Sequence, residues 1–375
     1  MTSLADRTGT SGALELALAP TTSPLDATER ARRMHQPAFG RVFTDHMVSA
    51  AWTVERGWHD GQLRPYAPLQ LDPSAMVFHY GQAIFEGLKA FRQAGGGVAL
   101  FRPEANARRF QRSAARLAMA ELPEDVFLRS LEALVRQDAA WVPEGVGDSL
   151  YLRPFMIATE PGLGVRPSNS YLYLLLASPA GPYFPQGIRP VTVWLSYEYT
   201  RAAPGGTGEA KVAGNYAASL LGQAEAAAQG CDQVVWLDAV EHTWVEEMGG
   251  MNLYFVFGRG QDARLVTPSL TGTLLPGITR DSLLTLARDL GYSSEERRIS
   301  VDEWHEASRS GELTEVFACG TAAVITPVGQ VKSAHGSWQV GDGEPGPVTL
   351  QLREAMLDLQ HGRAPDPHGW LHRVL

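Results

Sequence analysis

The chain has 375 residues and a formal net charge of −9, with 44% hydrophobic and 19% charged residues. This composition is typical of a globular protein, and at roughly 100–200 residues per domain it predicts two domains. The negative charge argues against a nucleic-acid partner, because phosphate binding needs clustered Lys and Arg. Two cysteines, Cys231 and Cys319, make neither a disulfide framework nor a zinc-ligand pattern, so no metal is expected.

The beginning of the chain lacks a basic segment followed by an apolar one, so we predict no signal peptide. The longest apolar run, residues 171–177, has the length of a strand and is too short to cross a bilayer. We therefore expect a cytoplasmic protein without a membrane partner.

Residues 1–35 mix Thr, Ser, Ala and charged residues without a lasting period, which predicts a flexible N-terminal tail. Residues 36–179 are predicted to form a small α+β domain. Its expected elements are strands near 48–54 and 75–80, a helix with Pro103 in its first turn, a helix through Phe127 and Val135, and strands at 149–158 and 170–177. The Gly- and Pro-rich stretch 180–190 is predicted to be the interdomain linker.

Residues 191–375 are predicted to form a larger α+β domain that carries Lys211. A strand at 191–197 and a Gly-rich loop at 204–208 precede this lysine, and a helix at 216–229 follows and ends at Gly230. Strands at 233–237 and 252–257 come next, then a helix at 279–290 with Thr279 as N-cap and a helix that opens on the capping box 300–303. A strand at 314–319 runs into the turn 320–322, and a helix at 349–361 is the last element. The pattern predicts an α+β fold of two mixed α/β domains meeting at a cleft.

The loop before Lys211 has the glycine content of a phosphate loop, which raises the possibility of a nucleotide-binding protein. It departs from the phosphate-loop pattern, because Val212 follows the lysine where that pattern has Ser or Thr. The chain also has no His-Glu-x-x-His and no Gly-x-Ser-x-Gly motif. Metal-hydrolase and serine-hydrolase chemistry therefore have little support.

Lys211 and Glu247 are the two candidates for cofactor chemistry. Lys211 is flanked by small and apolar residues, and a lysine in such surroundings loses hydration and can react as a neutral amine to form a Schiff base. Glu247 could keep a pyridine nitrogen protonated, so that the ring withdraws electrons from a substrate α-carbon. The structural alternatives are a solvated lysine at the end of a loop and a surface Glu-Glu pair.

Three features are suited to anions. Arg109 lies on an arginine-rich predicted helix, and an inward-facing arginine can clamp a phosphate. The stretch Gly277-Ile278-Thr279 begins a helix, where backbone N–H groups favour a phosphate. The turn 320–322 can offer N–H groups to a carboxylate. The alternatives are a solvated helix face, an ordinary capped helix and a simple turn.

Tyr151 and Arg153 are two residues apart on a predicted strand and therefore share one of its faces. A tyrosine and an arginine on an otherwise apolar strand are expected either in the wall of a pocket or as a pair facing solvent.

Read together, these segments resemble the branched-chain amino-acid aminotransferases, which are class-IV pyridoxal-phosphate enzymes of fold type IV. The similarity runs from residue 39 to the C-terminus. The segments that carry it are Phe-Gly-Arg-Val-Phe-Thr-Asp-His-Met (39–47), His-Tyr-Gly-Gln-Ala-Ile-Phe-Glu-Gly-Leu-Lys-Ala-Phe (79–91), Leu-Phe-Arg-Pro (100–103), Ser-Leu-Tyr-Leu-Arg-Pro (149–154), Gly-Pro-Tyr-Phe-Pro (181–185), Lys-Val-Ala-Gly-Asn-Tyr (211–216), Glu-Met-Gly-Gly-Met-Asn (247–252), Leu-Pro-Gly-Ile-Thr-Arg (275–280) and Gly-Thr-Ala (320–322).

The resemblance implies a role for each matching residue, with pyridoxal 5′-phosphate bound in the cleft between the domains. Lys211 matches the Schiff-base lysine and proton shuttle, Glu247 the partner of the pyridine nitrogen, and Tyr216 the partner of the ring oxygen. The phosphate-binding positions are matched by Arg109, Ile278 and Thr279. The positions that hold the substrate carboxylate are matched by Thr321 and Ala322, and Thr321 also approaches the phosphate. The apolar wall of the substrate pocket is matched by Phe39, Tyr80, Phe85, Tyr151 and Tyr183. Arg153 matches the arginine expected to receive the second carboxylate of glutamate.

The implied reaction is a ping-pong transfer of the amino group from L-leucine, L-isoleucine or L-valine to 2-oxoglutarate, in a homodimer. Within the fold, the alternatives are a D-amino-acid aminotransferase and an aminodeoxychorismate lyase. Two departures from the family pattern stand out. Ala323 and Thr326 replace the Cys-x-x-Cys pair of some mammalian members, and Gly250 replaces a threonine.

Overall fold

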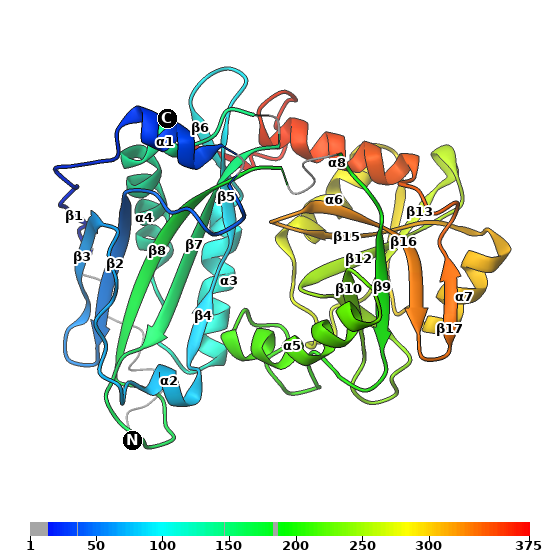
Figure 1. Cartoon of the computed structure of the whole chain (residues 1–375), viewed down its shortest axis with the longest axis horizontal. Coiled ribbons are helices and arrows are strands. Elements are labelled where there is room, and N and C mark those ends of the chain that lie inside the picture. The colour runs from blue at the N-terminus through cyan, green and yellow to red at the C-terminus, as the bar shows by residue number, and fades with distance from the viewer. Residues whose placement is uncertain (1–13, 36, 146, 183–186) are drawn as a thin grey trace. The chain divides into compact units, whose positions relative to one another are not determined.

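The computed structural model describes residues 14–35, 37–145, 147–182 and 187–375. The chain forms two compact units (Figure 1). Unit 1 comprises Met1–Tyr183, Ala210–Gly214 and Gln360–Leu375, and unit 2 comprises Phe184–Glu209 and Asn215–Leu359. The segment that carries Lys211 therefore belongs to unit 1, although it lies far along the chain. The domain boundaries expected from the sequence stay a prediction.

Unit 1 is built on a sheet with the strand order β1-β3-β2-β8-β7-β5-β6-β18, and β4 pairs with β7. The pairings are antiparallel except for β1 with β3. Its strands are β1 (Ala17–Leu18), β2 (His46–Thr53), β3 (Gly57–Pro65), β4 (Ala83–Phe85), β5 (Leu88–Arg92), β6 (Val98–Phe101), β7 (Ser149–Ala158), β8 (Ser170–Ala180) and β18 (Leu371–Arg373). The predicted strand 149–158 coincides with β7, at the centre of the sheet.

Two long helices supply most of the helical part of the unit 1 core. These are α3 (Pro103–Arg116), with Pro103 in its first turn as predicted, and α4 (Glu124–Gln137). The buried face of α4 packs on β2, β3 and β8. Phe127 and Leu131 on that face are 1% and 0% exposed. Burying a side chain of this size contributes roughly 1.5–3 kcal/mol, so these contacts anchor the helix to the sheet.

Strands β4 and β5 are separated by Glu86 and Gly87, and this break positions several candidate residues. The break faces Pro154 of β7, whose carbonyl accepts a hydrogen bond from the Glu86 N–H. Proline has no N–H to donate on this side of the strand, which is compatible with an interruption of the neighbouring strand. A Cβ on Gly87 would lie 2.0 Å from the Tyr151 hydroxyl, so only glycine fits there.

Two expectations for the N-terminal part differ from the structure. The segment 75–80 forms helix α2 (Met76–Tyr80) instead of a strand, and the helix ends at Gly81 in the left-handed conformation with φ 58°. Part of the predicted tail is ordered in the structure: β1 extends the edge of the sheet, and α1 (Ala27–Met34) begins at Asp26, whose side chain accepts the Glu29 N–H. Residues 1–13 lie outside the described residues.

Unit 2 contains a six-stranded closed barrel. Strand β11 pairs with both β10 and β12, which closes the ring β11-β10-β9-β16-β15-β12. Strands β13, β14 and β17 extend the sheet outside this ring. The strands are β9 (Val191–Ser196), β10 (Gln233–Leu237), β11 (Val245–Met248), β12 (Met251–Phe257), β13 (Arg264–Thr267), β14 (Ser293–Glu296), β15 (Leu313–Gly320), β16 (Val324–Ser333) and β17 (Gly336–Gln339). Closure leaves the six barrel strands without an open edge.

The helices of unit 2 are α5 (Ala213–Ala228), α6 (Ile278–Asp289), α7 (Val301–Ser310) and α8 (Pro347–Gln360). Helix α7 begins at Ser300, whose side chain accepts the Glu303 N–H, as the capping box predicted. Trp304 of α7 is fully buried, and its ring centre lies 5.1 Å from that of Phe255 in the core. Among the described residues, no helix is both long and apolar enough to cross a bilayer.

The start of α6 differs from the expectation. Its N-cap is Gly277, and Thr279 lies inside the first turn. The predicted threonine cap is therefore wrong. The N-cap is a glycine, which has no side chain to accept the first N–H groups of the helix.

Candidate active site

Lys211 is held by its backbone in unit 1. Its N–H donates to Ser113 Oγ on α3 at 2.9 Å, and its carbonyl accepts the Phe85 N–H at 3.1 Å. The next residue, Val212, bridges to Ile84. The chain around Lys211 thus runs along β4 as a short extended segment. Its Nζ lies 4.6 Å from the centre of the Phe85 ring, so the amine faces an aromatic surface.

Arg109, which lies on the same helix as Ser113, forms a buried ion pair with Glu86. Its Nε and Nη2 contact the two carboxylate oxygens of Glu86 at 2.7 and 2.8 Å. Asn106 Nδ2 donates to Glu86 at 2.7 Å, and the Gly87 N–H donates at 3.1 Å. Arg109 is 4% exposed and Glu86 is fully buried. The two-pronged contact therefore fixes the plane of the guanidinium.

The charge of Glu86 is stabilised by its surroundings. Burial by itself raises the pKa of this carboxyl, but the Arg109 guanidinium, the Lys211 ammonium and the Asn106 hydrogen bond together hold the pKa below its ordinary value. Glu86 is thus an anion placed beside both cationic candidates of unit 1.

Four predicted pocket residues of unit 1 lie together. The Tyr151 ring packs edge-on against the Phe39 ring with centres 4.9 Å apart. The Tyr151 hydroxyl accepts a hydrogen bond from Arg153 Nη2 at 2.9 Å, and the guanidinium lies 5.0 Å from the Phe85 ring centre. Arg153 Nε is buried and has no hydrogen-bond partner among the described residues. The pair is therefore part of an aromatic cluster and is not fully exposed to solvent.

Tyr80, another predicted wall residue, lies outside this cluster. Tyr80 is 40% exposed, its hydroxyl donates to the Leu163 carbonyl, and its ring packs against His79. Tyr183 lies outside the described residues.

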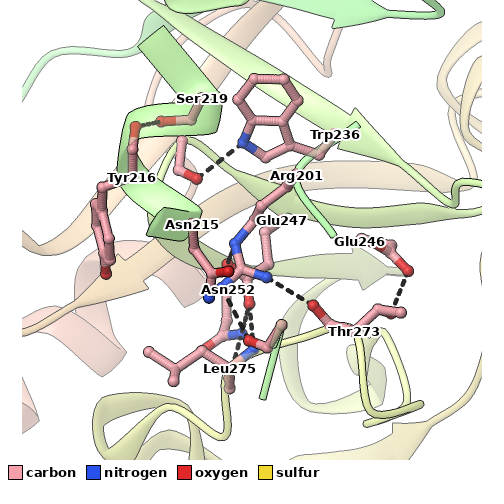
Figure 2. A network of polar contacts seen from close by, with 12 residues as sticks. Arg201, Asn215, Tyr216, Ser219, Trp236, Glu246, Glu247, Asn252, Thr273 and Leu275 are labelled. Carbon is pink, nitrogen blue, oxygen red and sulfur yellow. Dashed lines mark hydrogen bonds and ion pairs between the residues drawn. The ribbon is translucent and has the colours of Figure 1, made fainter. Parts of the chain in front are cut away.

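Glu247 belongs to unit 2, where it is 1% exposed on β11 (Figure 2). One carboxylate oxygen contacts Arg201 Nε at 2.9 Å, and the other accepts the Leu275 N–H at 2.6 Å and Asn252 Nδ2 at 3.4 Å. An arginine at this distance favours the ionised carboxylate. The alternative of a surface Glu-Glu pair is wrong, because Glu246 is also buried.

Glu246 points to a different partner, as expected for successive residues on a strand. It accepts a hydrogen bond from the Thr273 hydroxyl. Its pKa is raised by burial, which outweighs the opposing effects of Thr273 and of the Arg201 charge. Of the two glutamates, Glu247 is the one with the arginine in direct contact.

Tyr216 and Gly250 are neighbours in unit 2. Together with Arg201 and Asn215 of the same unit, they line a cavity of about 20 Å³. A Cβ on Gly250 would lie 3.4 Å from the Tyr216 ring. An alanine at position 250 would therefore be in van der Waals contact with this ring.

The predicted phosphate positions Ile278 and Thr279 occupy the first turn of α6, directly after the glycine N-cap. A helix that begins on glycine presents its first N–H groups without a competing side chain, which suits an anion.

Thr321 and Ala322 form the turn between β15 and β16. The turn ends at Val324, which has φ 63°. A β-branched residue in this region is strained, and such strain is often found at functional sites. The sequence identified the turn but gave no sign of the strain.

Three residues that orient the candidates were not selected from the sequence: Glu86 beside Arg109, Ser113 beside Lys211 and Arg201 beside Glu247. Glu86 lies within the segment 79–91, so the motif contained a signal. Nothing local distinguishes Ser113 or Arg201, because their partners are distant in sequence.

Comparisons with known proteins identify the family of the chain. The class IV amino-transferase family model matches residues 83–331. The branched-chain-amino-acid aminotransferase of Mycolicibacterium smegmatis is 62% identical over 365 residues, which is 97% of this chain and 99% of that protein. The crystal structure of the Escherichia coli branched-chain amino acid aminotransferase matches with a TM-score of 0.73 and 28% identity over 88% of this chain and 99% of that chain.

A third match is the crystal structure of the branched-chain amino acid aminotransferase from Thermobaculum terrenum in its PLP-bound holo-form. It has a TM-score of 0.69 and 26% identity over 87% of this chain and 98% of that chain. The chain belongs to the class-IV aminotransferases. Its mixed α/β fold with two sheets, one of which contains a six-stranded barrel, is similar to the folds of the solved branched-chain enzymes.

Proposed function

We propose that the chain is a pyridoxal-phosphate-dependent branched-chain amino-acid aminotransferase that moves the amino group of L-leucine, L-isoleucine or L-valine to 2-oxoglutarate. The observation that carries the proposal is the 62% identity over nearly the full length to an enzyme of that name. The fold-type-IV architecture, with the cofactor in the cleft between two domains, stays a prediction.

The residues present fit pyridoxal phosphate. The cofactor needs an amine, an anion site and a carboxylate for its pyridine nitrogen. Unit 1 has the amine of Lys211 and the buried cation Arg109, and unit 2 has the buried carboxylate Glu247 and the glycine-capped start of α6. The amine suits the aldehyde of the cofactor, Arg109 and the start of α6 suit its phosphate, and Glu247 suits its pyridine nitrogen.

When bound, pyridoxal phosphate supplies an aldehyde that accepts the amino nitrogen and a protonated ring that withdraws electrons from the substrate α-carbon. In our proposal Lys211 Nζ anchors the cofactor and moves the proton at the α-carbon. Ionised Glu247 keeps the proton on the pyridine nitrogen, and the Tyr216 hydroxyl binds the ring oxygen. The phosphate is bound by Arg109, Ile278 and Thr279.

The substrate pocket must accept both a branched aliphatic side chain and the second carboxylate of glutamate. The cluster of Phe39, Phe85 and Tyr151 supplies an apolar surface, and Arg153 supplies a cation whose Nε is buried without a partner among the described residues. A buried donor without a partner is costly, so a carboxylate ligand is stabilised there. We propose that Tyr80 and Tyr183 complete the wall, and that the Thr321–Ala322 turn binds the α-carboxylate.

We also propose a homodimer, a cytoplasmic location and small-molecule partners, namely the branched-chain amino acids, glutamate and their 2-oxo acids.

The visible spectrum of the purified protein tests the proposal. We expect a yellow cofactor band that L-leucine, L-isoleucine, L-valine and L-glutamate each convert to the pyridoxamine form, while D-alanine has no effect. The chain has three lysines, so borohydride reduction and peptide mapping should find the cofactor on Lys211 and not on Lys89 or Lys332. Lys211→Ala should lose the band, and the matched variant Lys332→Ala should keep it.

Two results would contradict parts of the proposal. Conversion by D-alanine and not by L-leucine would make the chain a D-amino-acid aminotransferase. The absence of a band after incubation with pyridoxal phosphate would refute the cofactor assignment.

A further inference from the structure

Arg201 is a buried cation of unit 2, 7% exposed, that bonds to three separate segments. Figure 2 shows it between Glu247 and Thr273. Its Nε contacts Glu247 on β11 at 2.9 Å. Its Nη1 donates to the Thr273 carbonyl at 2.6 Å, and its Nη2 donates to the Gly208 carbonyl at 3.1 Å. The Gly-rich loop, the segment before α6 and the candidate carboxylate are therefore all bonded to one guanidinium.

The shape of the guanidinium makes this arrangement directional. Its N–H groups lie in one plane, so two carbonyl bonds on one side fix the direction in which Nε points. The two carbonyls are neutral acceptors. Of the three groups bonded to Arg201, Glu247 is therefore the one that compensates the charge of the guanidinium. The backbone at Gly208 also lies close to the backbone at Thr273, because a Cβ on Gly208 would lie 2.2 Å from the Thr273 carbonyl oxygen. A lysine at position 201 has the charge but cannot reproduce three bonds in one plane.

We propose that Arg201 is a positioning residue for the aminotransferase reaction: it holds Glu247 ionised and in one orientation, and ties the Gly-rich loop to that carboxylate. The inference rests on the proposed function, in which Glu247 keeps the cofactor pyridine protonated. Arg201 itself acts through Glu247 and needs no contact with the substrate.

Besides Arg201, Glu247 has contacts with two neutral donors, Asn252 and the Leu275 N–H. The Cys319 thiol lies on β15, which pairs with β12 opposite Asn252, and burial raises its pKa, so that it stays protonated. Glu246 is directed to Thr273 and carries no positive charge. Removing the guanidinium should therefore make protonation of Glu247 easier, since a buried carboxylate without a cation favours its neutral form.

The test compares the pH profiles of kcat/KM for holoenzymes with L-leucine. In Arg201→Met we expect the acidic limb to move to higher pH by about one to three units, because the essential carboxylate is lost earlier as the pH falls. At neutral pH the rate should fall by about tenfold to a hundredfold. Arg201→Lys should recover most of the limb position but only part of the rate.

A readout without turnover comes from the visible band of the bound cofactor, titrated with acid in the absence of substrate. Its pH dependence should move in the same direction in Arg201→Met. Glu247→Gln provides the double-mutant cycle: if Arg201 acts through Glu247, adding Arg201→Met to Glu247→Gln costs little further rate.

Arg280→Met is the matched control. Arg280 is also buried in unit 2, at 3% exposed, but its side chain bonds to the Pro268 carbonyl and Glu296. We expect this variant to lose stability and to keep the wild-type acidic limb. Three outcomes would each overturn the inference. The acidic limb of the pH profile could move equally in Arg280→Met, or it could stay in place in Arg201→Met. The rate losses of Arg201→Met and Glu247→Gln could also multiply fully in the double mutant. A wild-type chain that takes up no pyridoxal phosphate would instead refute the proposed function and, with it, this inference.

Discussion

The buried pair of Glu86 and Arg109 makes a quantitative prediction about stability. The carboxylate is fully buried, the arginine is 4% exposed, and Glu86 accepts four hydrogen bonds in the structure. Removing one partner of a buried pair leaves the other charge uncompensated and costs about 3–5 kcal/mol. A whole domain is stable by only about 5–15 kcal/mol, so Glu86→Gln should remove a large share of the stability of this chain.

The assay is urea unfolding of wild type and Glu86→Gln, followed by circular dichroism and tryptophan fluorescence. Asp125→Asn is the control, because its pair with Arg129 is exposed and contributes about 0–1 kcal/mol. The pKa of Glu86 is lowered in the folded chain from its ordinary value of 4.5. Its charge therefore stabilises the fold above that pH, and the difference between wild type and Glu86→Gln should shrink as the pH falls through the folded pKa. A loss below about 1 kcal/mol at neutral pH would refute the reasoning, since it is no larger than that of an exposed pair.

Two further predictions concern close packing and the C-terminus. Gly87→Ala places a Cβ 2.0 Å from the Tyr151 hydroxyl, whereas Gly250→Ala meets the Tyr216 ring at 3.4 Å. We expect the first to lower the free energy of unfolding by about 1–3 kcal/mol and the second to change it little, and equal melting temperatures would contradict this. His372 lies 2.9 Å from both Glu104 and Glu132; burial lowers its pKa, but the two carboxylate contacts outweigh this and the pKa is raised. The stability that the charge of His372 supplies is full below pH 6.5 and is lost as the pH rises through the folded pKa. His372→Asn should therefore lower the melting temperature more at pH 6 than at pH 9. The reverse order would be inconsistent with a charged histidine.

Long, regularly patterned segments were predictable from the sequence. The strand 149–158, the helix beginning at Pro103 and the capping box at Ser300 all appear in the structure as expected. The errors occur at short elements and at helix ends. Residues 75–78 are apolar and strand-like by composition, but an apolar run this short does not distinguish a strand from one helical turn. At 277–279 both glycine and threonine are acceptable N-caps, and only the backbone conformation showed that Gly277 takes this position.

The sequence by itself determined the class of chemistry: its ordered motifs are similar to those of the aminotransferases, and Lys211, Glu247 and Arg109 are candidates from the sequence alone. Only the tertiary structure decided what surrounds them. Ser113 is 98 residues from Lys211, and Glu86 is 23 residues from Arg109. Such partners are brought together by strand pairing and helix packing, which depend on contacts between distant segments. A local pattern can therefore identify the group that reacts, but the groups that orient it and set its charge follow from the fold.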